Sequence, residues 1–232
     1  VLATRRPPAF AGLGGSSSHG PSWSRPTLAS LAGMTLIERK RALRGAMMIR
    51  RQGLGEDDRR AAAAGLLDIY QLECPAELPA VVSGFWPIKD EIDIHPLMAH
   101  LRGEGCRLAL PVVHGRGQRL SFRAWQPGDP LESGVFGTLQ PLAGCETLEP
   151  DILLVPLLAC DSEGWRLGYG GGYYDRTLED LRRRRKVTAI GVGFDLQFIP
   201  DVPHGAGDQR LDWLLTDRRA CALLALRAGR PV

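Results

Sequence analysis

The sequence has no long hydrophobic run and no closely spaced cysteines, and each absence excludes a class of protein or site. Nowhere do about 18 apolar residues follow one another, which excludes a membrane-spanning helix. The five cysteines lie far apart, and no two of them have the two-residue spacing of zinc or dithiol sites. Because dispersed thiols suit a reducing compartment, we expect a cytoplasmic protein with no membrane partner.

The sequence also has little excess of charge of either sign. The 29 Lys and Arg residues face 26 Asp and Glu residues, for a formal net charge of +3. A protein that binds nucleic acid usually concentrates basic residues on one face. The one dense basic run, Arg182 to Lys186, lies at the end of a predicted helix, where cations favour the helix dipole. We therefore expect no nucleic-acid partner.

The first 33 residues contain no Asp or Glu and little apolar sequence, and they are rich in Gly, Ser and Pro. Such a segment cannot bury enough surface to offset the entropy of ordering, so we predict a disordered N-terminal extension. Residues 34–232 are predicted to form one domain, and Met34 is a candidate for the true start. An acid-free leader that contains Arg and Ser is also compatible with an organellar transit peptide.

From Thr35 onward, helix-like and strand-like patterns alternate. Predicted helices cover residues 36–50, 57–70, 92–101 and 173–184, and predicted strands cover 81–86, 107–113, 119–125, 152–158, 187–194 and 211–215. The Pro- and Gly-rich residues 127–150 are predicted to be loop with short irregular pieces. The apolar runs at 152–158 and 187–194 are typical of strands buried on both faces of a parallel sheet. The pattern predicts a single α/β domain with a mainly parallel sheet and helices on both faces.

One segment, from Asp161 to Asp175, has the composition of a phosphate site. Four of its glycines, Gly168 and Gly170 to Gly172, allow close approach of the backbone, and the helix that follows offers unpaired N–H groups. Arg166 supplies a planar cationic fork, and Asp175 a carboxylate that could hold Mg²⁺ against phosphates. A glycine cluster alone is more often a plain turn, and this one matches neither the Walker pattern nor the dinucleotide fingerprint.

The stretch from Arg166 to Arg176, Arg-Leu-Gly-Tyr-Gly-Gly-Gly-Tyr-Tyr-Asp-Arg, resembles the signature of the 5-formyltetrahydrofolate cyclo-ligases, also called methenyltetrahydrofolate synthetases. The resemblance extends from about Leu36 to Asp217. Some relatives carry basic residues at the positions of Tyr169 and Gly171, so nucleotide contacts from this loop are expected to rest more on its backbone. Other matching landmarks are Lys40 with Arg44, Trp86 with Asp90 to Ile92, Leu110 to Val113, Phe136 with Pro141, Asp151 to Pro156, and Phe194 to Asp217.

The resemblance implies a fold similar to the sugar-isomerase and CoA-transferase-like folds. It also implies an enzyme that uses ATP and Mg²⁺ to convert 5-formyltetrahydrofolate to 5,10-methenyltetrahydrofolate through phosphorylation of the formyl oxygen, and we expect this enzyme to work as a monomer. The residues implied to bind ATP are Lys40, Arg44, Arg166, Gly168, Tyr169, Gly170, Gly171, Gly172, Tyr173 and Tyr174. Those implied to bind the folate are Trp86, Glu91, Phe136 and Tyr173, and those implied to bind the metal are Asp175 and Asp208.

Without the resemblance, several of these residues have plainer interpretations. Lys40 and Arg44 share a helix face and would be solvated surface charge, while Trp86 and Phe136 would be core aromatics. The sequence does not decide whether Tyr173 or Tyr174 faces a pocket. Two other functions stay open at this point: a related ATP-binding enzyme that acts on another small molecule, and a non-catalytic folate- or nucleotide-binding protein.

Overall fold

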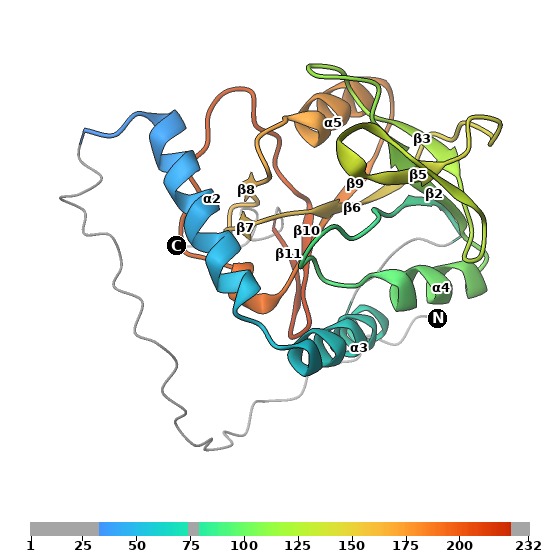
Figure 1. Cartoon of the computed structure of the whole chain (residues 1–232), viewed down its shortest axis with the longest axis horizontal. Helices are drawn as coiled ribbons and strands as arrows, with labels where there is room; N and C mark the ends of the chain where they lie inside the picture. The colour runs from blue at the N-terminus through green and yellow to red at the C-terminus, as the bar shows by residue number, and fades with distance from the viewer. Residues whose placement is uncertain (1–32, 74–78, 224–232) are drawn as a thin grey trace, which may run out of the picture. The chain divides into compact units, whose positions relative to one another are not determined.

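The structure is a computed structural model that describes residues 33–73 and 79–223 (Figure 1). The prediction of disorder for residues 1–33 therefore falls outside the described residues, apart from Gly33. In the described part, no helix is both long and apolar enough to cross a membrane. The helices are α2 (Leu36–Gln52), α3 (Glu56–Glu73), α4 (His95–Gly103) and α5 (Tyr173–Arg184), with 3-10 turns η1 (Val135–Gly137) and η2 (Asp195–Gln197).

Local chemistry explains where the helices begin. Thr35 caps α2 in a capping box: the Glu38 backbone N–H donates to the Thr35 hydroxyl at 3.3 Å, and the Thr35 backbone N–H donates to the Glu38 carboxylate at 2.7 Å. Acidic residues fill the first turn of α3, where they favour the helix dipole. Gly172 precedes α5 with a φ of +64°, a left-handed conformation that suits glycine.

Seven strands form one mixed sheet, in the order β11-β10-β9-β6-β1-β2-β3. The five strands from β10 to β2 run parallel, and antiparallel strands pair at both edges, β11 on β10 and β3 on β2. This confirms the prediction of a mainly parallel sheet. The strands are β1 (Val81–Ser83), β2 (Arg107–Val112), β3 (Ser121–Ala124), β6 (Ile152–Pro156), β9 (Thr188–Val192), β10 (Trp213–Leu215) and β11 (Ala220–Ala222).

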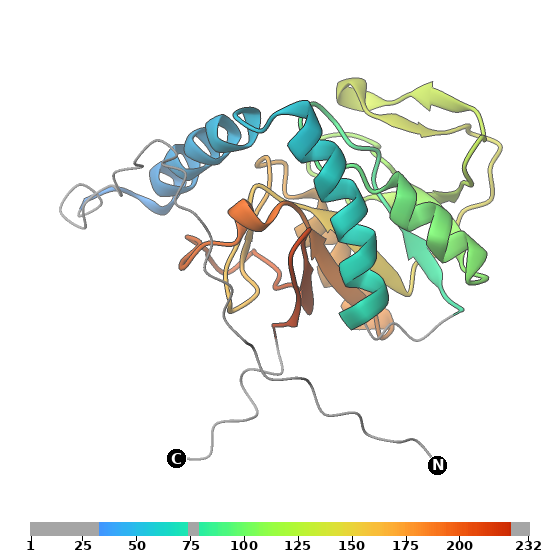
Figure 2. The ribbon, with the colours of Figure 1, turned by 90° about the horizontal axis from the view of Figure 1, so that it is seen from below.

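Helices cover both faces of the sheet, as predicted (Figures 1 and 2). Leu66 of α3 and Leu101 of α4 pack against one face, in a cluster with Leu154 of β6. Leu178 and Leu181 of α5 pack against the other face with residues of β6 and β9. Alternate residues of the parallel strands thus point into two separate cores, which accounts for their continuous apolar sequence.

Five short strands were not predicted from the sequence. Residues 127–150, predicted as loop, contain the hairpin β4 (Leu131–Ser133) and β5 (Leu139–Pro141), and another hairpin joins β7 (Ala159–Cys160) to β8 (Arg166–Leu167). The edge strand β11 was also missed. Strands of two or three residues are too short for alternation to be detected, so tertiary pairing decides them.

The two predicted elements on either side of residues 84–94 have different bounds in the structure. The strand predicted over 81–86 ends at Ser83, and the next residue packs so closely on α4 that a side chain on Gly84 would lie 2.7 Å from the Met98 sulfur. The helix predicted over 92–101 begins at His95, with proline in its first turn. Both changes leave residues 84–94 as a loop that follows β1.

Candidate active site

A pocket of about 410 Å³ lies at the carboxyl ends of three parallel strands. Trp86 follows β1, Val113 follows β2, and Pro156 ends β6, and all three line it. Helix α2 and the glycine-rich loop after β8 complete its walls. In open α/β sheets, ligands bind beyond the carboxyl ends of the strands, so the pocket lies where the topology predicts a binding site.

The pocket brings together the residues predicted to form the site. Those that line it are Lys40, Arg44, Trp86, Glu91, Arg166, Gly168, Tyr169, Gly170, Gly171, Gly172, Tyr173, Tyr174, Asp175 and Asp208. Phe136 lies in η1, but its side chain is outside the described part of the structure. Both tyrosines at 173 and 174 line the pocket, so the choice between them does not arise.

The glycine-rich loop has a backbone that only glycine adopts easily. Gly170 has a φ of +100°, and a side chain there would lie 3.2 Å from the guanidinium carbon of Arg44. Arg44 also donates from Nε to the carbonyl of Gly168 at 2.8 Å. Helix α2 therefore docks onto the loop through Arg44, and the loop ends at Gly172, where the N–H groups of α5 begin.

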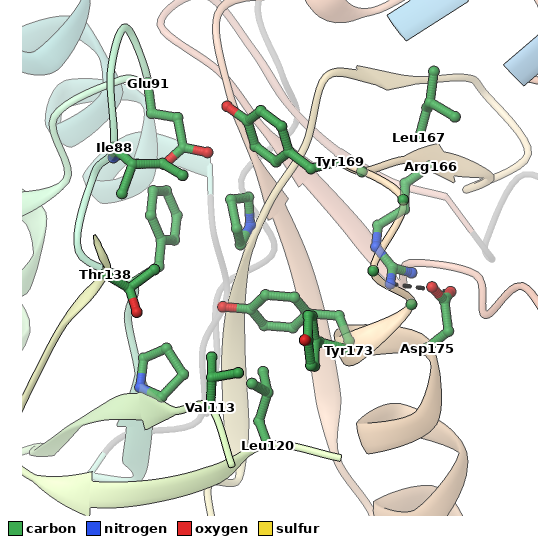
Figure 3. Close-up of a pocket in the computed structure, with 18 of the residues that line it drawn as sticks. Ile88, Glu91, Val113, Leu120, Thr138, Arg166, Leu167, Tyr169, Tyr173 and Asp175 are labelled. Carbon is green, nitrogen blue, oxygen red and sulfur yellow. Dashed lines mark hydrogen bonds and ion pairs between the residues drawn. The ribbon is translucent and has the colours of Figure 1, made fainter. Parts of the chain in front are cut away.

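Paired charges fill the end of the pocket beside this loop. Lys40 Nζ donates to both carboxylate oxygens of Asp208, at 2.7 and 2.5 Å. Arg166 Nη2 lies 3.0 Å from Asp175 Oδ1 (Figure 3), and Arg166 Nη1 donates to the carbonyl of Gln209 at 2.8 Å. The Gln209 backbone N–H in turn donates to Asp175 Oδ1 at 2.9 Å.

Burial sets the electrostatic character of this end. Arg166 is only 8% exposed, and its burial lowers the pKa of the guanidinium, although an arginine in a protein stays charged. A buried cation needs a partner, which Asp175 supplies here. Lys40 and Arg166 can therefore each exchange the paired carboxylate for an anionic ligand and remain compensated.

The opposite end of the pocket is mostly apolar and holds one carboxylate. Glu91 accepts a hydrogen bond from the Ile88 backbone N–H at 3.0 Å, and its burial raises the pKa of the carboxyl group. Trp86 lies edge-on to His95, with ring centroids 4.6 Å apart. The other side chains at this end are Phe85, Ile88, Pro111, Val113, Leu120, Thr138 and Leu139. Figure 3 shows Glu91, Thr138, Val113 and Leu120 on the side opposite Arg166 and Asp175.

One tyrosine has an unsatisfied polar atom in the wall of the pocket. Among the described residues, the Tyr174 hydroxyl is buried without a hydrogen-bond partner. An unpaired buried hydroxyl costs free energy, so a group that binds beside it would gain a hydrogen bond.

Sequence reasoning missed Arg51, which is 1% exposed at the end of α2. Its guanidinium binds both carboxylate oxygens of Asp90, with Nε 2.9 Å from Oδ2 and Nη2 3.0 Å from Oδ1. The spacing of Lys40, Arg44 and Arg51 was the available signal. Steps of four and seven residues keep all three on one helix face.

The two carboxylates predicted to bind metal come from distant segments. Asp175 is in the first turn of α5, and Asp208 is in the loop before β10. In the described part of the chain, no group of three or more His, Cys, Asp or Glu side chains could hold a metal ion. A cation here would need further ligands from a bound anion.

Comparisons with known proteins identify the family of this chain. The model of the 5-formyltetrahydrofolate cyclo-ligase family matches residues 36–217. The 5-formyltetrahydrofolate cyclo-ligase of Escherichia coli K12 is 32% identical over 147 residues, which cover 61% of this chain and 80% of that protein. The enzyme of that name from Mycolicibacterium smegmatis is 33% identical over 154 residues, covering 63% of this chain and 77% of that protein.

Solved structures show the same similarity. The NMR structure of Aquifex aeolicus 5,10-methenyltetrahydrofolate synthetase superposes with a TM-score of 0.68 at 31% identity, covering 83% of this chain and 95% of that chain. A Mycoplasma pneumoniae 5,10-methenyltetrahydrofolate synthetase shares the fold, with a TM-score of 0.61 at 23% identity, covering 77% of this chain and 99% of that chain. The sequence matches and the fold agree, and this chain belongs to the 5-formyltetrahydrofolate cyclo-ligase family.

Proposed function

We propose that this pocket converts 5-formyltetrahydrofolate to 5,10-methenyltetrahydrofolate with cleavage of ATP to ADP and phosphate. One observation carries the proposal: a single pocket has a cationic, glycine-rich end and an apolar end with one carboxylate. The first suits a triphosphate and the second suits a pterin. Membership of the family supports both the activity and the use of ATP.

At the nucleotide end, Lys40, Arg44 and Arg166 would bind the phosphates of ATP. The backbone N–H groups of the loop from Gly168 to Gly172 and of the first turn of α5 would add neutral donors. Phosphoryl transfer needs alignment and charge neutralisation more than a covalent role for the protein, and these groups provide both.

At the folate end, Glu91 would accept hydrogen bonds from the amino and ring N–H donors of the pterin. Trp86 and Tyr173 line the space where an aromatic ring would lie, and stacking against it would favour binding. Phe136 remains a predicted contact on the strength of the resemblance alone.

The reaction would proceed in two steps. The formyl oxygen attacks the γ-phosphorus of ATP and ADP leaves, which turns a poor leaving group into a good one. N10 then attacks the activated formyl carbon and loses its proton, and phosphate leaves as the five-membered ring closes. Residues of this chain hold the two substrates in one pocket, so both bonds form without a substrate escaping.

The residues present fit a magnesium ion that arrives with ATP. Mg²⁺ usually takes one or two protein carboxylates together with phosphate oxygens, and Asp175 and Asp208 are two carboxylates at the nucleotide end. When bound, the ion would neutralise charge on the phosphates. Lys40 and Arg166, now paired with those carboxylates, would then be released to bind phosphate oxygens.

We further propose that the enzyme works as a monomer and in the cytoplasm. Light scattering of the purified protein would test the first proposal. A dimer that persists on dilution would contradict it.

The activity is tested with the purified full chain, 5-formyltetrahydrofolate and Mg²⁺, with and without ATP. We expect the absorbance of the methenyl product to rise only when ATP is present, with one ADP released per product. ATP cleavage without methenyl product would point to another substrate. Binding of both ligands without any turnover would point to a non-catalytic binding protein.

A further inference from the structure

Arg51 connects the two ends of the pocket through Tyr169. Besides its two contacts with Asp90, the Arg51 guanidinium donates from Nη2 to the Tyr169 hydroxyl at 2.5 Å. The guanidinium carbon also lies 5.7 Å from the centre of the Tyr169 ring. Asp90 thus orients the arginine fork, and the fork fixes the position of the tyrosine hydroxyl.

The Tyr169 side chain belongs to the glycine-rich loop but points away from the nucleotide end. Its hydroxyl interacts with the carboxylate of Glu91, and Figure 3 shows the two side chains facing each other. A tyrosine hydroxyl can accept one hydrogen bond and donate another, so it can accept from Arg51 and donate to Glu91.

We propose that Arg51 and Tyr169 are positioning residues for the folate end, where they hold the Glu91 carboxylate as the acceptor for the pterin. This inference rests on the proposed role of Glu91. The Tyr169 side chain then belongs to the folate end and not to the nucleotide end, where the resemblance places it. The loop then serves ATP with its backbone and the folate with this side chain.

Electrostatics gives this positioning role a consequence that can be measured. Burial raises the pKa of Glu91, whereas the Ile88 N–H, the charge of Arg51 and the Tyr169 hydroxyl lower it. Asp90 opposes them as a like charge, and Tyr174 also faces Glu91 from α5. Only the ionised carboxylate accepts two hydrogen bonds from the pterin, so folate affinity falls as pH falls through this pKa. Removing the Tyr169 hydroxyl raises the pKa and moves that loss to higher pH.

The test compares Tyr169→Phe with the wild type in the full-length enzyme. KM for 5-formyltetrahydrofolate and KM for ATP are measured separately across the acid range. We expect Tyr169→Phe to raise the folate KM roughly tenfold, the usual scale for a lost hydrogen bond to a charged group, and to change the ATP KM by less than about twofold. The acid limb of kcat/KM for the folate should shift to higher pH.

Two further variants separate a positioning role from a general loss of stability. Arg51→Lys keeps the charge but loses the fork that reaches both Asp90 and Tyr169, so it should shift the acid limb in the same direction. Tyr70→Phe is the matched control, since Tyr70 of α3 packs in the core against α4 and lines no part of the pocket. It should leave both KM values and the acid limb unchanged.

The outcomes distinguish this inference from the proposed function. If Glu91→Gln weakens folate binding but Tyr169→Phe leaves the folate KM and the acid limb unchanged, the positioning role is overturned and the proposed function stands. A rise in ATP KM alone for Tyr169→Phe would also overturn the positioning role. If Glu91→Gln leaves folate binding intact, the assignment of Glu91 in the proposed function is wrong.

Discussion

The two ends of the pocket are built from the chain in different ways. The nucleotide end draws most of its groups from ten consecutive residues, Arg166 to Asp175, with two cations added by α2. The folate end takes its side chains from the loop after β1, the ends of β2 and β3, and the β4–β5 hairpin, together with Tyr169 and Tyr173. A site made of one local segment has a recognisable spacing, whereas a site made of many segments has none.

The two ends also differ in their charges. Lys40 and Arg166 are each paired with a carboxylate, so the nucleotide end holds balanced charges that a bound anion and cation can exchange. Glu91 is a single carboxylate among apolar side chains, and burial raises its pKa. The nucleotide end is therefore suited to highly charged ligands, and the folate end to a neutral ring with hydrogen-bond donors.

The largest expected effect concerns Asp175 at the nucleotide end. Asp175→Asn should lower kcat by roughly 100-fold or more, the scale for losing one electrostatic group at a phosphoryl-transfer site. The fold should persist at some cost in stability, because the asparagine oxygen can still accept from the Gln209 N–H and from Arg166, although Arg166 loses its charged partner. Higher Mg²⁺ should restore part of the activity, and Mg²⁺ titration by calorimetry should show weaker binding in the presence of ATP.

The control for this variant lies on the same helix. Glu179→Gln alters an exposed carboxylate of α5 that pairs only with Arg183 among the contacts described, so kcat should hold. Full activity of Asp175→Asn would remove Asp175 from the site.

The next largest effect is expected on ATP binding, and it should distinguish the nucleotide end from the folate end. Arg166→Ala should weaken ATP binding by about 1.5–3 kcal/mol, the usual range for a lost charged hydrogen bond, with little change in folate affinity. Each ligand is titrated alone by calorimetry or fluorescence quenching. Arg183→Ala, an exposed arginine on α5, serves as control. Equal losses for ATP and folate would show that the two ends are not distinct.

A smaller effect is expected at the folate end. Glu91→Gln keeps the shape but replaces one acceptor oxygen with a donor group, so folate affinity should fall roughly tenfold while ATP affinity holds. The wild type should lose folate affinity as pH falls through the raised pKa of Glu91, and the variant should lack that step. Weaker ATP binding with unchanged folate binding would reverse our assignment of the two ends.

The smallest effect is expected for the N-terminal segment, which belongs to neither end of the pocket. Deletion of residues 1–33 should change neither melting temperature nor kcat, because this segment has no core-forming pattern. Differential scanning calorimetry and the methenyl assay would measure both. A melting temperature lowered by several degrees would show that the segment docks on the domain.

Much of the fold was predictable because its elements carry strong local signals. The apolar spacing over residues 36–50 indicates α2, and the apolar runs around Leu154 and Ile190 indicate the central strands β6 and β9. The short pieces β7, β8 and β11 carry no such signal. β7 pairs with β8, and β11 with β10, over only two or three residues, so these pairings depend on the packing around them rather than on a repeating sequence pattern.

The sequence by itself determined the glycine-rich loop, the helix after it, and the face of α2 that carries Lys40 and Arg44, because each depends on spacing within a few residues. Only the tertiary structure decided that Lys40 meets Asp208, 168 positions later, and that Arg51 meets Tyr169, 118 positions later. Sheet order and the docking of α2 bring these partners together. These contacts depend on the order of the strands in the sheet, so residue spacing within a short segment does not predict them.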